Sequence, residues 1–165
     1  MHFTIAAAVA VVVALFEFTV VPYLKIGDAV PHPVLVFGVI WAIAGGLEVG
    51  LVWAFVGGLA LDILGQRPLG SSAFSLLIAI GIASLVGGFF SRVRIAAPVI
   101  ATAIASLVFS MLLLITTTAL TTAPLSDTAL AAVVPSAVYD TVLAAIFGPL
   151  AIAIVLRRRE ERVDW

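Results

Sequence analysis

The sequence predicts an all-α integral membrane protein, a compact bundle of six transmembrane helices with short loops. Hydrophobic residues make up 64% of the 165 residues and charged residues only 10%, whereas a globular domain has about 25% charged residues. The apolar residues form runs long enough to cross a bilayer, and glycine, proline and polar residues gather between the runs. A water-soluble domain of this length could not bury so much apolar surface, so residues 1–165 are expected to form a single transmembrane domain.

The first half of the chain predicts helices over residues 3–21, 34–45 and 48–64. The first is interpreted as a retained helix and not a signal peptide, because its start lacks basic residues and it ends at Pro22-Tyr23. The apolar run over residues 34–64 is too long for one straight span, since a single helix would measure ~46 Å against ~30 Å of hydrocarbon. Gly45-Gly46, followed by Glu48, indicates a break. A single bent helix over the same residues remains the alternative.

The second half predicts longer helices over residues 71–90, 95–120 and 129–156. The segment GQRPLG (residues 65–70) stops the preceding helix, because it combines glycine, proline and polar residues. Polar residues near 91–94 and 121–127 separate the later helices. Pro98 is tolerable in the first turns of its helix, and Pro135 or Pro149 is expected to bend the last one.

Arginine placement predicts the orientation of the bundle. Arg92 and Arg94 lie in one short loop, and Arg157–Arg159 follow the last helix. Two spans separate these clusters, so they lie on the same side, which the positive-inside rule makes cytoplasmic. With six spans, both termini are predicted to be cytoplasmic. If residues 34–64 were one helix, the N-terminus would lie outside.

The residues that usually carry soluble chemistry are scarce. The chain has no cysteine and only two histidines, His2 and His32, so thiolate metal sites are excluded and no metal-like cluster is apparent. There is no glycine-rich phosphate loop, Ser/His/Asp set or extended basic patch. We therefore expect no catalytic residue, no cofactor, no metal and no nucleic-acid partner.

A ridge of small residues is the clearest pattern in the chain. Gly46, Gly50, Ala54 and Gly58 recur every four residues, so they share one face of a helix and allow another backbone to approach closely. We predict that this ridge is a partner or packing interface. A second ridge, Ala6, Ala10 and Ala14, is interpreted first as ordinary bundle packing and second as a docking face.

Asp62 occupies the next position of the first ridge, in otherwise apolar sequence. A carboxylate at mid-membrane costs ~2.5–3.5 kcal/mol on insertion scales and is therefore a candidate functional or structural group. The alternative is an acid near the interface that pairs with Arg67 or caps a neighbouring helix.

Asp140 follows Tyr139 in the last predicted helix, five residues after Pro135. These three residues form a second candidate polar site, functional or structural, because Pro135 leaves a helical carbonyl without its usual donor. An interfacial acid beside an anchoring tyrosine is slightly favoured over a functional role. Glu17 is interpreted as interfacial. A proton or cation path through Glu17, Asp62 and Asp140 is a less favoured hypothesis.

Several of these residues also match the motif of a known protein family. The stretch from residue 31 to residue 70 resembles the rod shape-determining protein MreD of bacteria, whose signature combines a Pro-polar start, glycines at four-residue steps, a Gly-Leu-x-x-Asp stretch and a closing Leu-Gly. The matching residues are Pro31-His32, Gly46, Gly50, Phe55, Gly58-Leu59, Asp62 and Leu69-Gly70. A second, weaker match is VVPSAVYDTVLAAIFGPL, where Pro135, Tyr139 and Asp140 resemble the family's Pro-Ser-x-x-Tyr-Asn stretch. The chain departs from the pattern at His32, where Asp or Asn is common, at Gly45, where a basic residue is frequent, and at Asp140, where Asn is usual.

The resemblance implies a non-enzymatic subunit of the cell-elongation machinery in the bacterial inner (plasma) membrane. It implies contact with MreC, a single-span protein with a periplasmic domain. Through MreC it implies indirect links to RodA, to a class B penicillin-binding transpeptidase and to MreB, and so to lateral peptidoglycan synthesis. A homodimer and membrane lipid are further expected partners.

The alternative is a substrate-binding subunit of an energy-coupling-factor vitamin transporter. That family shares a small six-helix build, and its first helix carries an Ala-x-x-x-Ala docking motif like Ala6 and Ala10. Trp41 and Trp53 would be available to grip a vitamin, although their predicted depth favours structural packing.

Overall fold

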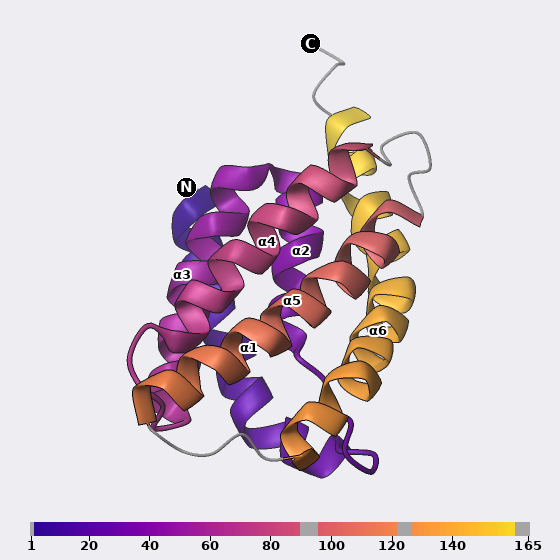
Figure 1. Ribbon diagram of the computed structural model, residues 1–165. Helices are drawn as coiled ribbons and strands as arrows, with labels where there is room; N and C mark the ends of the chain where they lie inside the picture. The colour runs from indigo at the N-terminus through magenta and orange to yellow at the C-terminus, as the bar shows by residue number, and fades with distance from the viewer. Residues whose placement is uncertain (1, 90–95, 122–126, 161–165) are drawn as a thin grey trace.

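The computed structural model describes residues 2–89, 96–121 and 127–160, and within these ranges the chain is an all-α bundle (Figure 1). This confirms the predicted fold class. The described ranges contain six helices: α1 (His2–Leu24), α2 (Pro33–Gly45), α3 (Leu47–Leu64), α4 (Ser71–Phe89), α5 (Ala96–Thr121) and α6 (Asp127–Glu160). Among the described residues, five helices are long and apolar enough to cross a membrane, and α2 is a shorter apolar helix of 13 residues.

The apolar run over residues 34–64 is divided into two helices at Gly46. This glycine has φ 101°, a left-handed conformation that favours a residue without a Cβ. Its N–H donates to the carbonyl oxygen of Ala42 over 3.1 Å, and its own carbonyl oxygen accepts the N–H of Gly50 over 3.2 Å. One residue therefore closes α2 and opens α3, and the alternative of a single bent helix is wrong.

The short helix α2 lies at the centre of the bundle. It packs against each of the other five helices within the described residues, and most of its side chains are buried. At ~1.5 Å per residue it is only ~20 Å long. Figure 1 shows its longer neighbours around it. A helix too short to cross alone is thus covered on its sides by helices that can.

The ridge of Ala6, Ala10 and Ala14 is fully buried where α1 packs against α3. A Cβ placed on Gly57 of α3 would lie 3.6 Å from the Cβ of Ala10 and 2.9 Å from a methyl carbon of Val34. Small residues on both helices therefore allow their backbones to lie close together, as in other membrane bundles.

The ridge on α3 is also covered, by helices of the same chain. A Cβ on Gly50 would overlap the side chain of Ala42 in α2, and a Cβ on Gly58 would overlap the backbone of Ala73 in α4. Ala54 is fully buried, and Gly46 is exposed at the turn. This corrects the expectation that the ridge could receive a partner: Gly50, Ala54 and Gly58 already pack α3 against its own neighbours.

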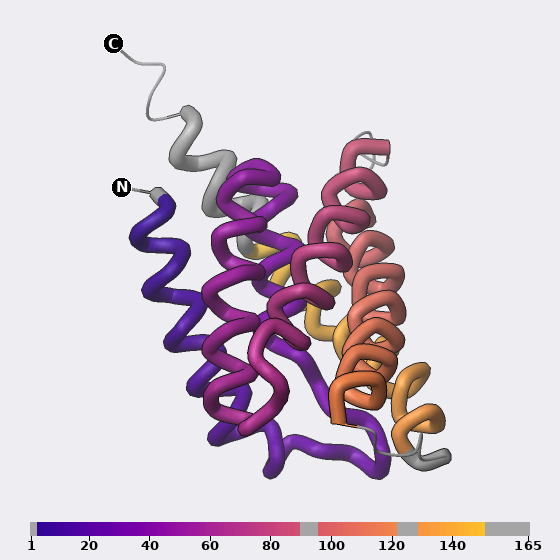
Figure 2. The backbone as a smooth tube through the Cα atoms, turned by 60° about the vertical axis from the view of Figure 1, so that its left-hand side comes forward, coloured from indigo at the N-terminus to yellow at the C-terminus, as the bar shows by residue number. Residues whose placement is uncertain are grey.

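The ends of the helices alternate between the two ends of the bundle. The start of α1, the Gly46 turn and the end of α6 lie at one end, and the connections over residues 25–32 and 65–70 lie at the other (Figures 1 and 2). This order matches the predicted alternation of loops. Arg92 and Arg94 lie outside the described residues, as do the side chains of Arg157–Arg159, so the predicted cytoplasmic side stays a prediction.

Candidate functional site

Asp62 is fully buried near the end of α3 and caps the start of α4. Its Oδ2 accepts the N–H of Gly70 at 2.8 Å, and its Oδ1 accepts the N–H of Ser72 at 2.9 Å and the hydroxyl of Ser71 at 3.0 Å. The first N–H groups of a helix have no partner within the helix, and a carboxylate there is stabilised by the helix dipole.

The local sequence places these groups where Asp62 can reach them. Gly70, with φ 95°, turns the chain into α4, and the backbone N–H of Arg67 donates to the carbonyl oxygen of Asp62 over 3.0 Å. The guanidinium of Arg67 lies 3.5 Å from the hydroxyl of Ser72 instead of forming an ion pair with Asp62. Leu69, the other member of the closing Leu-Gly, is 72% exposed and takes no part in the cap.

A second polar cluster surrounds a non-helical segment that runs into the bundle just before α2. Figure 2 shows the chain turning back from the lower end of the bundle toward its centre here. Pro31 is fully buried, and neither it nor Pro33 has an N–H group. The N–H groups of the alternate residues Val30, His32 and Val34 do need acceptors, because unpaired backbone groups inside a membrane protein are costly.

Side chains from two other helices supply those acceptors. The N–H of Val30 donates to the hydroxyl of Ser136 at 3.0 Å, and the N–H of His32 donates to Oδ1 of Asp140 at 2.7 Å. The N–H of Val34 donates to Oε2 of Glu17 at 2.7 Å. Glu17 belongs to α1 and the other two acceptors to α6, so the segment links two helices whose backbones lie apart.

Asp140 is the centre of this cluster and is fully buried. Its Oδ2 lies 3.0 Å from Nδ1 of His32 and 2.5 Å from the hydroxyl of Ser106 in α5. One carboxylate therefore joins α5, α6 and the start of α2. The extended backbone before α2 encloses Asp140, which supports a structural role. Its place near the membrane interface stays a prediction.

Glu17, which was also interpreted as interfacial, acts as a cap. It is half-buried, and its carboxylate accepts an N–H of the first turn of α2, whose own preceding residue, His32, provides no side-chain cap. Sequence reasoning also missed Ser106 and Ser136. The signal available for Glu17 and Ser136 was the alternation of prolines with residues whose N–H groups need acceptors; it does not extend to Ser106, which donates to Asp140.

Tyr139 and Pro135 lie beside the cluster and not in it. The hydroxyl of Tyr139 donates to the carbonyl oxygen of Leu24 over 3.4 Å, and Pro135 is exposed within α6. Trp53 is buried, donates its indole N–H to the carbonyl oxygen of Val34 over 2.9 Å and stacks on Trp41 with ring centroids 5.1 Å apart. The two tryptophans thus pack against the bundle and against each other.

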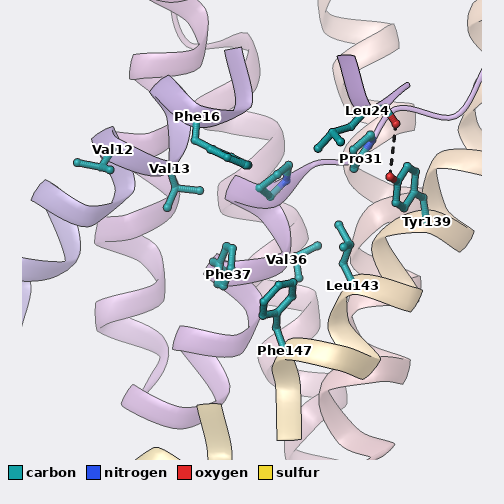
Figure 3. A pocket seen from close by; sticks show the side chains of 11 residues that line it. Val12, Val13, Phe16, Leu24, Pro31, Val36, Phe37, Tyr139, Leu143 and Phe147 are labelled. Carbon is teal, nitrogen blue, oxygen red and sulfur yellow. Dashed lines mark hydrogen bonds between the residues drawn. The ribbon is translucent and has the colours of Figure 1, made fainter. Parts of the chain in front are cut away.

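A lateral groove runs between α1 and α6, with α2 as its floor (Figure 3). Its volume is about 460 Å³. Figure 3 shows the hydrogen bond from Tyr139 to Leu24 at one end and Phe147 near the other. Phe147 also contacts Phe37, with ring centroids 5.4 Å apart. The lining residues are Val12, Val13, Phe16, Leu24, Pro31, Pro33, Val36, Phe37, Tyr139, Leu143 and Phe147.

These features define a class: a multi-pass helical membrane protein in which Glu17 and Asp62 cap helices of the same chain and the outer faces are largely apolar. The described side chains contain no group of three or more His, Asp or Glu placed to hold a metal ion.

The chain belongs to the MreD family, because the model of rod shape-determining protein MreD matches residues 1–158. It therefore has a role in rod-shape determination, in a family of shape-determining proteins and not of known enzymes. Comparisons with curated proteins and with solved structures find no match.

Proposed function

We propose that this chain is a non-enzymatic subunit of the cell-elongation machinery in the bacterial inner membrane, where it scaffolds or regulates lateral peptidoglycan synthesis through helix–helix contacts with MreC. Family membership supports a role in cell shape. The proposed contact with MreC rests on which side chains the bundle exposes to other molecules in the membrane.

The observation that carries the proposal is the use of the acids that face the inside of the bundle. Glu17, Asp62 and Asp140 all accept hydrogen bonds from the chain's own backbone. Groups engaged in this way stabilise the fold. What remains for a partner is the apolar outer surface, on which Phe18, Phe55 and Phe74 are each about half exposed. A single-span partner such as MreC would meet such faces laterally, through close packing of side chains.

The vitamin-transport alternative receives less support from the same side chains. A site for a polar vitamin needs a few convergent polar groups in its wall. The groove between α1 and α6 is lined by apolar residues and one tyrosine, whose hydroxyl bonds to Leu24. The tryptophans that could have gripped a ligand stack on each other.

Photo-crosslinking in cells tests the proposal. Phe18 in α1, Phe55 in α3 and Phe74 in α4 would each be replaced by a benzoyl-phenylalanine, with the buried Phe109 as the matched control. We expect an MreC adduct at one or more of the exposed positions and none at Phe109. If none of the three exposed positions, nor further lipid-facing positions on α5 and α6, gives an adduct while both proteins are expressed, the proposed contact is wrong.

A further inference from the structure

We propose that the groove between α1 and α6 binds one acyl chain of a membrane phospholipid. Val12, Val13 and Phe16 of α1 form one wall, Leu143 and Phe147 of α6 form the other, and α2 forms the floor (Figure 3). The backbones of the two walls lie apart, with the extended segment before α2 between them, and Tyr139 reaches across to Leu24 at one end.

The chemistry of the lining selects hydrocarbon. Ten of the eleven lining residues are aliphatic, phenylalanine or proline, and the remaining residue is Tyr139. Its hydroxyl is directed to the carbonyl oxygen of Leu24 at the end of the groove (Figure 3). A headgroup or a polar solute inside the groove would lose its hydrogen bonds to water without replacement, which costs several kcal/mol. An alkyl chain loses nothing comparable.

The size of the groove distinguishes an alkyl chain from a helix. An engineered cavity of about 150 Å³ holds benzene, which is roughly 25 Å³ per carbon atom. On that scale the groove between α1 and α6 would hold roughly 18 carbon atoms. The groove measures about 460 Å³. One turn of an α-helix, about 10 Å wide and 5.4 Å long, occupies about 420 Å³. The groove volume therefore corresponds to one acyl chain, whereas a spanning helix could insert only the side chains of part of one face.

The groove is continuous with the surface that faces lipid. Val12 in the α1 wall is 63% exposed, and Ile146, which lies in α6 outside the lining, is 61% exposed. Both helices are long and apolar enough to cross the membrane, so the groove opens onto the hydrocarbon. If the groove were empty, the side chains of both walls would lack dispersion contacts on that side. The acyl chains of the bilayer are the molecules that supply those contacts.

Native mass spectrometry of the full chain, extracted in mild detergent, tests the proposal by counting and identifying retained lipids. Leu143→Trp narrows the groove from α6, and Leu150→Trp makes the same change at a position that is 58% exposed and outside the groove. We expect wild type and Leu150→Trp to retain one diacyl phospholipid, and Leu143→Trp to retain about tenfold less. The absence of retained lipid in wild type, equal retention in Leu143→Trp, or retention of an isoprenoid lipid instead would overturn the proposal.

A crosslinking measurement on the wild-type chain removes any dependence on how the variant folds. A phospholipid with a diazirine in its acyl chain would be reconstituted with the protein in nanodiscs. We expect the label to concentrate on the peptides that carry Val12, Val13 and Phe16 and on those that carry Leu143 and Phe147. Even labelling of all lipid-facing helices would contradict a specific acyl-chain site.

Discussion

Asp62, Glu17 and Asp140 share one role, because each accepts backbone N–H groups at or just before the start of a helix. Asp62 accepts N–H groups at the start of α4, Glu17 accepts one in the first turn of α2, and Asp140 accepts the N–H of His32, the residue just before α2. The start of a helix carries partial positive charge and unpaired N–H groups. Each acid thus gains a partner from another segment's backbone in a bundle that has few basic side chains.

Substitution of Asp62 should separate loss of hydrogen bonding from loss of charge. Asp62→Asn keeps one oxygen for Ser72 and loses the bond from Gly70, so we expect a loss of about 1 kcal/mol in unfolding free energy. Asp62→Leu leaves the N–H groups of both residues without a partner, for a loss of roughly 3 kcal/mol or more. Unfolding of the purified protein by SDS titration in micelles measures both. Equal losses would contradict the capping role.

Asp140 should tolerate an amide for a related reason. In Asp140→Asn the remaining oxygen still accepts the N–H of His32, and the new NH₂ group can donate to the hydroxyl of Ser106. We expect a loss under about 1.5 kcal/mol, against roughly 3 kcal/mol for Asp140→Leu. The exposed Asp28→Asn is the control and should change stability by less than about 0.5 kcal/mol. The same SDS titration distinguishes these outcomes.

The sequence identified Asp62 and Asp140 as candidates because carboxylates in apolar segments are conspicuous. It did not identify their bonding partners. The bond from His32 to Asp140 joins residues 108 apart in the chain, and that from Val34 to Glu17 joins residues in different helices. The periodicity of a sequence describes one helix at a time. It therefore cannot predict contacts between residues of different helices.

At the level of elements, small residues decide which helices can lie close together. The sequence predicted the ridge on α3 from its four-residue spacing, and it also predicted the break at Gly45-Gly46. It could not tell whether the ridge would meet another chain or the same one, because the spacing is identical in both cases. The contacts of Gly50 with α2 and of Gly58 with α4 answer that question.

Two glycines offer a matched test of the close approach between α3 and α4. A Cβ on Gly58 would overlap the backbone of Ala73, whereas a Cβ on Gly81 of α4 would have nothing within 4 Å. We expect Gly58→Ala to destabilise the bundle by about 1–3 kcal/mol, because backbone cannot move aside as a side chain can. Gly81→Ala should be neutral or stabilise by up to about 1 kcal/mol. Thermal unfolding in detergent compares the pair, and a similar change in both would contradict the packing described.

At the scale of the whole molecule, the described part of the chain encloses Asp62 and Asp140 and exposes many large apolar side chains. The carboxylates of Glu17 and Asp62 hold α2 and α4 at their starts, while the exposed large residues of the spans are largely apolar. Composition alone predicted the membrane bundle, since so apolar a chain has no other stable environment. Composition could not predict the lateral groove, because its width depends on the extended segment that separates α1 from α6.

The central claim is that Glu17, Asp62 and Asp140 serve the fold, so that rod-shape determination does not depend on their charge. Cell length-to-width ratio tests it most directly, in cells whose only copy of the protein carries Glu17→Gln or Asp140→Asn. Both amides keep an oxygen acceptor for the backbone, so the account predicts rod-shaped cells with wild-type dimensions. Round cells, at wild-type levels of folded variant and with undiminished MreC crosslinking, would contradict it and would assign a function to the charge itself.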